Sequence, residues 1–305
     1  MKIGTFSVVV GTAACDAACP FCVSKMTAQN APASPTINWR NFEIGCRFAR
    51  DGGVSTVLLT GKGEPLLCPD QITNYLTVGR SYFPFMELQT NGIRLFGEIP
   101  EEKISEWYRD GLTLVCLSVA HWDSTENARI MQPRGKKWLR IWNVIERLHS
   151  VGLSVRLNCT MVKGGIDSFE QLDHLLDRCR EKGVEQLTLR DVTTPTDTNN
   201  PEITKWVLDN QVKYMTPEWT GSSGYHYFPQ EVSGSEMVHH YLKTKDATPI
   251  MTLPHNALVY DCEGQNVCIN NCLTTTLATD EIRQLIFFPD GHLRYDWTYK
   301  GAVIL

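Results

Sequence analysis

The order of apolar segments constrains the fold of this chain more than any other sequence feature. Short runs rich in β-branched residues alternate with longer segments of helical periodicity from the N-terminus to about residue 215. Such alternation is typical of repeated βα units, which build a parallel sheet. The predicted strands cover residues 3–10, 55–60, 85–90, 112–120, 154–162 and 186–192.

Helix boundaries are marked between these predicted strands. Asn38 can cap one helix, and Pro100 precedes a helix over 101–109. A third helix can begin at Asp167 or Ser168. We therefore expect an α/β fold, an incomplete (βα)6 parallel barrel. A doubly wound open sheet is the alternative, and the sequence leaves both open.

The amino-acid composition changes after the sixth predicted strand. A turn-rich linker leads into a segment rich in Tyr, His, Gly and Pro, and two apolar runs within 285–297 flank a Pro-Asp-Gly turn. We place a domain boundary near residue 215. Residues 1–215 are the predicted partial barrel, and residues 216–305 are a predicted smaller α+β cap whose hairpin could close over the barrel mouth.

Composition excludes several classes of protein. The 29 Lys and Arg against 34 Asp and Glu give a formal net charge of −5, and the basic residues read as scattered rather than gathered into a run. This argues against nucleic acid as the main partner. No apolar run approaches the roughly 18 residues of a membrane span, and no signal-peptide layout opens the chain. We expect a cytoplasmic protein without a membrane partner.

The eleven cysteines are unevenly distributed. Cys15, Cys19 and Cys22 form a C-x3-C-x2-C loop directly after the first predicted strand. Three thiolates can hold three irons of a cubane cluster and leave the fourth iron open to another ligand. A structural zinc loop usually needs four ligands in paired spacings, and no second pair lies nearby. The loop therefore favours an iron–sulfur cluster over zinc or over three buried thiols.

Further segments make the chain similar to the radical SAM (S-adenosylmethionine) superfamily. Residues 60–65 read Thr-Gly-Lys-Gly-Glu-Pro and resemble that family's glycine-glutamate-proline motif, although many members have a glycine in place of Lys62. Segments 88–92, 117–119, 156–158 and 189–191 follow in the expected order. The resemblance covers about residues 3–195. It implies a 4Fe-4S cluster on the three cysteines and a bound SAM that chelates the open iron.

The resemblance also implies which residues bind SAM. The edge from Gly61 through Lys62 and Gly63 to Glu64 would hold the methionyl amine, since glycines let the backbone approach a ligand closely. The backbone around Phe21 would lie beside the adenine. Four polar residues at strands or strand ends could reach the ribose or the carboxylate, or could be ordinary hydrogen-bonded groups of the barrel: Asn91, Ser118, Asn158 and Arg190.

Two other groups of residues permit more than one interpretation. Cys262, Cys268 and Cys272 look like part of the twitch and SPASM extensions that carry auxiliary clusters, but the match is incomplete. A second cluster is possible, and we favour a single cluster per chain. His121 and Trp122 follow the fourth predicted strand, where they could contact a substrate or simply pack in a loop.

The resemblance implies an enzyme that reductively cleaves SAM to a 5′-deoxyadenosyl radical and abstracts hydrogen from a small-molecule substrate. It would need a one-electron donor such as flavodoxin or ferredoxin. One alternative is a maturase of peptides or proteins with an auxiliary cluster. Another is a non-catalytic metal-binding protein on the same fold. The substrate and the fate of SAM are not specified by the sequence.

Overall fold

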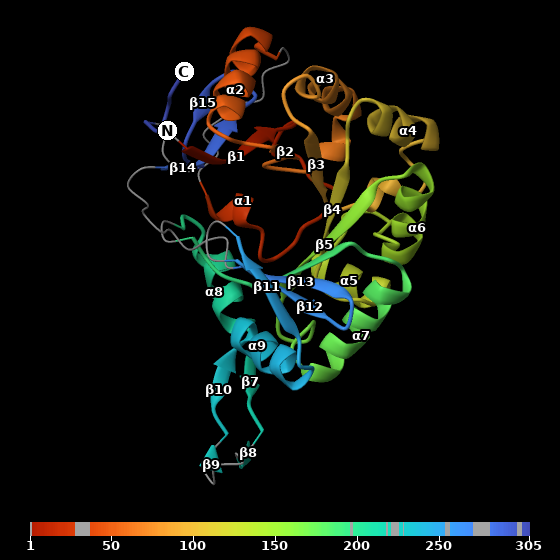
Figure 1. Cartoon of the computed structure of the whole chain (residues 1–305), viewed down its shortest axis with the longest axis vertical. Coiled ribbons are helices and arrows are strands. Elements are labelled where there is room, and N and C mark those ends of the chain that lie inside the picture. Colours follow the sequence, from red (N-terminus) through yellow and green to blue (C-terminus); the bar gives the residue numbers. More distant parts are fainter. Residues whose placement is uncertain are drawn as a thin grey trace.

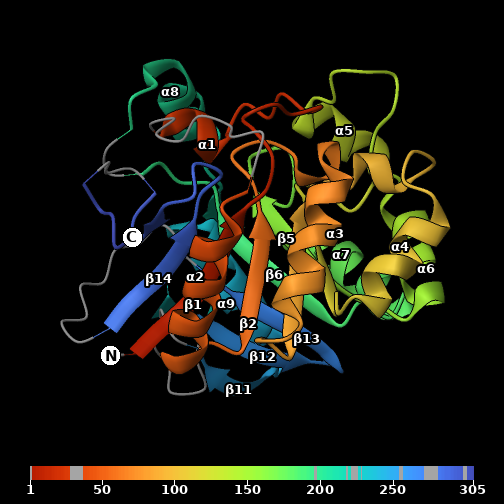
Figure 2. The ribbon, with the colours of Figure 1, turned by 90° about the horizontal axis from the view of Figure 1, so that it is seen from above.

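The computed structural model of the chain is built around one mixed sheet (Figures 1 and 2). It describes residues 2–27, 37–195, 198–217, 219–220, 226–227, 229–253, 257–270, 281–297 and 301–305. Within these residues the large sheet has 11 strands in the order β11-β12-β13-β6-β5-β4-β3-β2-β1-β14-β15. The strands bend into an open arc in Figure 1.

The first six strands confirm the predicted βα repeat. They pair in chain order and every pair is parallel. Each strand end lies within two residues of its predicted position. Their bounds are β1 (Lys2–Val9), β2 (Thr56–Thr60), β3 (Phe85–Thr90), β4 (Leu114–Val119), β5 (Ser154–Met161) and β6 (Gln186–Asp191).

Most helices that connect these strands lie on the outer side of the arc, whereas the short helix after β1 lies inside it (Figure 1). Asn38 caps α2 by accepting a hydrogen bond from the Asn41 N–H, and Ser168, not Asp167, caps α7 through the Gln171 N–H. The helix bounds are α1 (Val23–Met26), α2 (Trp39–Asp51), α3 (Pro69–Gly79), α4 (Glu101–Arg109), α5 (Ser124–Met131), α6 (Ile141–Val151), α7 (Phe169–Glu181), α8 (Pro201–Asp209) and α9 (Gly234–Thr244).

The two faces of the sheet have different chemistry because side chains alternate along each strand. Leu117, Leu157 and Leu187 belong to the main core, and each such buried leucine contributes roughly 1.5 to 3 kcal/mol. Ser118 and Asn158, their neighbours along the chain, are register partners on the opposite face. The inner, concave side of the arc therefore presents polar groups, and the loop after β1 crosses this side (Figure 1).

Strands from the C-terminal part of the chain extend the sheet at both ends. β14 (Glu281–Phe287) lies parallel to β1, and β13 (Gln265–Ile269) lies parallel to β6. β12 (Leu258–Cys262) and β11 (Thr248–Thr252) follow β13 as antiparallel neighbours. The partner of β14 in a short antiparallel pair is β15 (Leu293–Arg294), which confirms the predicted hairpin.

The expected position of this hairpin is wrong. Leu285, Phe287 and Leu293 belong to the main core and do not close over the mouth of the barrel. The Phe287 ring lies 5.3 Å from the Phe42 ring of α2. Burial against α2 explains the difference, because the apolar hairpin residues find a larger apolar surface on the helix side of the sheet.

A separate two-stranded ribbon projects from the body of the molecule (Figure 1). β7 (Lys213–Met215) pairs with β10 (Glu231–Ser233), and β8 (Trp219–Thr220) pairs with β9 (His226–Tyr227). The predicted domain boundary near residue 215 falls at the end of β7 and stays a prediction. Among the residues that the structure describes, no helix is long and apolar enough to cross a membrane.

Candidate functional site

The cysteine loop, residues 10–22, brings three thiols together inside the arc of the sheet. Cys15, Cys19 and Cys22 are all half-buried. Burial, together with the neighbouring Cys22 and Cys15 thiols, raises the pKa of Cys19 to about 12. Burial likewise raises the pKa of Cys15. Iron bound at these thiols would displace their protons. Metal binding would therefore be coupled to the stability of the local fold.

Backbone contacts fix the shape of this loop. The Ala17 N–H donates to Cys15 Sγ at 3.4 Å, and the Cys19 thiol donates to the Met131 carbonyl at 3.2 Å. In the described part of the chain, no three His, Cys, Asp or Glu side chains are placed to hold a single metal ion. A set of three clustered thiols fits a three-cysteine iron–sulfur cluster by its chemistry, with one iron left without a protein ligand.

Gly63 is required by the cysteine loop itself. A Cβ atom at this position would lie 1.9 Å from the Ala14 carbonyl oxygen and 2.7 Å from that of Thr12. The next residue, Glu64, donates its backbone N–H to Ala14 at 2.9 Å. A Cβ on Gly61 would be less crowded, at 3.0 Å from the Gly63 oxygen. The glycines of residues 60–65 thus allow two loops of the protein to touch.

Glu64 joins the end of β2 to the end of β3. Its carboxylate is buried and accepts hydrogen bonds from Thr90 Oγ1 at 2.5 Å, from the Asn91 N–H at 2.9 Å and from the Leu66 N–H at 2.9 Å. Burial raises the pKa of Glu64 to about 7, and the three hydrogen bonds oppose that rise. Because these donors already occupy the carboxylate, Glu64 serves first to position the loop; a contact with SAM stays a prediction.

Asn91 is held against the cysteine loop. Its Nδ2 donates to Asp16 Oδ1 at 2.7 Å and approaches Cys15 Sγ at 3.8 Å. Arg94 donates from Nε to the other carboxylate oxygen of Asp16 at 3.1 Å. Asp16 and Arg94 are not among the residues predicted for the site. The position of Asp16 between two of the predicted ligand cysteines was the one signal available.

The Lys62 side chain points toward α1. This direction could not be predicted from the sequence. Its Nζ donates to Thr27 Oγ1 at 2.9 Å and lies 5.6 Å from the centre of the Trp297 ring. Its carbonyl accepts a short hydrogen bond from Ser24. Burial lowers the pKa of Lys62, while Cys22 and Asp296 act in the opposite direction. Lys62 therefore connects the glycine loop (residues 60–65), the segment around α1 and the C-terminal segment.

The remaining predicted SAM-binding residues occupy the inner face and its rim. Ser118 and Asn158 are half-buried register partners, and neither side chain makes a hydrogen bond within the described residues. Arg190 donates from Nε to Thr160 Oγ1 at 3.2 Å. The Phe21 ring packs 5.8 Å from the Trp206 ring of α8. The structure thus gathers Gly61 to Glu64 and Asn91 at the cysteine loop, whereas SAM contacts for all of these residues stay predictions.

A buried ion pair lies deeper on the same face and was not predicted. Glu87 of β3, 4% exposed, pairs with Arg156 of β5 and accepts a hydrogen bond from Gln89 Nε2 at 2.9 Å. The signal for this pair in the sequence is a charged residue, Glu87 or Arg156, within each of two predicted strands. Such a pair is costly to bury and organises the polar floor of the concave side.

The other two predicted groups, the residues around His121 and the C-terminal cysteines, lie elsewhere in the fold. His121 Nδ1 accepts the Asp123 N–H at 2.9 Å, which fixes the ring within its own loop. Cys262 lies in the main core, whereas Cys268 packs with Ala257 and Val259 in a separate small cluster. Cys272 lies outside the described residues. A single cluster per chain stays a prediction.

Solved structures of other proteins share this fold. The structure is similar to that of SuiB from Streptococcus suis bound to S-adenosylmethionine, with a TM-score of 0.60, 16% identity and coverage of 98% of this chain. SuiB bound to its precursor peptide SuiA gives a TM-score of 0.59, 16% identity and 97% coverage. The chain spans 62% and 60% of the two SuiB chains. These likenesses show the fold.

Sequence comparison identifies the family. No curated protein sequence matches the chain significantly. The family model for the radical SAM superfamily matches residues 9–179, more than half of the 305 residues. This match includes the cysteine loop, the glycine loop and the end of β3, which the structure brings into contact. The chain therefore belongs to the radical SAM superfamily.

Proposed function

We propose that this chain is an enzyme that holds a 4Fe-4S cluster on Cys15, Cys19 and Cys22 and cleaves SAM to act on a small-molecule substrate. One observation carries the proposal: three half-buried thiols lie in one loop, and that loop is joined to the glycine loop by the 2.9 Å hydrogen bond from Glu64 to Ala14. Once bound, the cluster and SAM supply one-electron cleavage of the sulfonium and a 5′-deoxyadenosyl radical that abstracts hydrogen.

The residues of the chain would position and enclose the reactants. Gly61 and Gly63 let the glycine loop lie against the cysteine loop, where its backbone carbonyls would bind an ammonium group. Ser118 and Asn158 offer hydrogen-bonding groups from the inner face, where they have no partner among the described side chains. The pair Glu87 and Arg156 forms a polar floor beneath. This lining favours a polar substrate.

The proposal is tested by anaerobic reconstitution with iron and sulfide, followed by reduction with dithionite in the presence of SAM. We expect about four irons per chain and formation of 5′-deoxyadenosine without added substrate. A screen of deuterated small molecules would then reveal the substrate by deuterium in 5′-deoxyadenosine. Iron binding without any cleavage of SAM would favour the non-catalytic metal-binding alternative.

A second candidate is modification of a peptide or protein. Its support is the fold similarity to SuiB, whose structure was also obtained with its precursor peptide SuiA. Because that similarity shows the fold alone, the two candidates need a direct comparison. A short precursor-peptide gene beside the gene for this chain, and deuterium transfer from that peptide but from no small molecule, would favour the second candidate.

A further inference from the structure

The loop that follows α5 concentrates positive charge at the surface. Residues 134–140, here called the basic loop, carry four exposed basic side chains in seven positions: Arg134, Lys136, Lys137 and Arg140. The expectation that basic residues are scattered along the chain is wrong for this segment. The formal net charge of −5 conceals it, because a whole-chain balance averages over local clusters.

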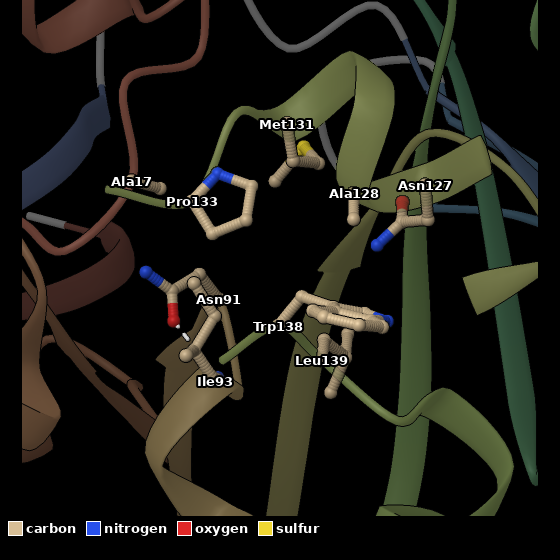
Figure 3. Close-up of a pocket in the computed structure, with 9 residues that line it drawn as sticks. All are labelled: Ala17, Asn91, Ile93, Asn127, Ala128, Met131, Pro133, Trp138 and Leu139. Atoms are coloured by element: carbon tan, nitrogen blue, oxygen red, sulfur yellow. Dashed lines mark hydrogen bonds between the residues drawn. The ribbon is translucent and has the colours of Figure 1, made fainter. Parts of the chain in front are cut away.

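The basic loop lies directly against the cysteine loop. The Arg134 N–H donates to the Asp16 carbonyl at 2.7 Å, and Arg134 Nε donates to the Ala17 carbonyl at 3.4 Å. Ala17 and Pro133 form an antiparallel bridge, and Figure 3 shows Pro133 beside Ala17. In Figure 2, α1 and α5 lie at the same edge of the molecule. The positive charge is thus presented next to the three cysteines.

Nearby carboxylates do not cancel this charge. Glu98 pairs with Lys137 at 3.1 Å and with Arg94 at 2.8 Å, and Asp16 pairs with Arg94 at 3.1 Å. The four cations of the basic loop together with Arg94 make five, against these two carboxylates, which leaves a balance of +3. Lys136 has no ion-pair partner in the part of the chain that the structure describes.

We propose that the basic loop is the docking surface for a small acidic protein that carries single electrons. This inference rests on the proposed function, which consumes one electron for each SAM that is cleaved. The reduced flavin or iron–sulfur centre of the carrier is oxidised by one electron, the cluster held by Cys15, Cys19 and Cys22 is reduced by one electron, and no atom is transferred. Opposite charges on the two surfaces speed the encounter and orient the carrier toward the cysteines.

Charge reversal with a matched control tests the surface. The test variant combines Lys136→Glu with Lys137→Glu, and the control combines Lys213→Glu with Lys243→Glu. Lys137 and Lys213 are 60% and 65% exposed, and each pairs with one carboxylate, at 3.1 and 3.3 Å. Lys136 and Lys243 are both exposed and have no ion-pair partner among the described residues. β7 and α9, which carry the control, lie away from the cysteine loop in Figure 1.

The primary measurement is the Kd of oxidised flavodoxin, and separately of oxidised ferredoxin, for each protein by calorimetry before iron is loaded. We expect the basic-loop variant to raise the Kd about tenfold or more, and the control to change it less than about twofold. Raising the salt from about 0.05 M to about 0.5 M should weaken binding to the wild type much more than binding to the basic-loop variant.

A second readout separates this inference from the proposed function. In reconstituted enzyme, the basic-loop variant should lose most of its carrier-driven formation of 5′-deoxyadenosine and keep its dithionite-driven rate. Equal affinity of the basic-loop variant and the wild type for the carriers, or no binding of either carrier to the wild type, would overturn the docking surface. Absence of dithionite-driven SAM cleavage in the wild type contradicts the proposed function instead, and the binding result before iron loading still decides the docking surface.

Discussion

Replacing Gly63 by Ala tests whether the contact between the glycine loop and the cysteine loop shapes the site. The added Cβ would lie 1.9 Å from the Ala14 carbonyl oxygen. Ordinary carbon–oxygen contacts are about 3.3 Å, so the two loops must separate by about 1.4 Å. Overpacking of this kind costs roughly 1 to 3 kcal/mol, which corresponds to a fall of about 2 to 6 °C in the midpoint of thermal unfolding.

The assay compares three alanine variants by thermal unfolding before iron loading and by iron content after reconstitution. Gly301→Ala is the control, because a Cβ there meets no atom within 4 Å. Gly61→Ala is intermediate, with its Cβ at 3.0 Å from the Gly63 oxygen and 3.2 Å from the Val10 oxygen. We expect stability and iron content to fall in the order Gly301, Gly61, Gly63. A Gly63→Ala protein with wild-type stability and about four irons would refute the reasoning.

Three further predictions concern the site. Joint substitution of Cys15, Cys19 and Cys22 by Ala should abolish SAM cleavage and leave no iron; about four residual irons with a cluster EPR signal would instead reveal a second cluster. Asn158→Ala should weaken SAM binding by roughly 1 to 3 kcal/mol in calorimetry, and an unchanged affinity in a folded protein would reassign Asn158 to barrel structure. Glu64→Gln turns an amide N–H toward a backbone N–H, so the free energy of unfolding in urea should fall by roughly 1 to 3 kcal/mol, whereas an unchanged value would show that the carboxylate is not needed there.

The strands of the βα repeat could be predicted because each carries its own local pattern. β3 matches its prediction at both ends, since the segment 85–90 is bounded by residues that end a strand. The pairing of β14 with β1 could not be predicted. Nothing in the residues around Ile286 specifies a partner near Ser7, because the pairing depends on three-dimensional packing and not on local periodicity.

The same distinction applies to the site. The spacing of Cys15, Cys19 and Cys22 can be recognised in the sequence because the three predicted ligands lie in one loop. The bonds from Asp16 to Asn91 and Arg94 join segments about 75 residues apart, so no local pattern predicts them. The position of the basic loop beside the cysteine loop could not be predicted either, because that contact forms only in the folded chain.

The place of β14 and β13 in the sheet has a consequence for synthesis of the protein on the ribosome. The six parallel strands are complete once β6 has been made, yet both outer edges of that unit, at β1 and β6, are paired by strands that begin at Gln265 and Glu281. Until those strands emerge, the nascent chain has two open edges, which are prone to pair with other chains. The segment from Gln265 onward therefore protects both sheet edges from aggregation, and β1 keeps an open edge until this segment has been synthesised.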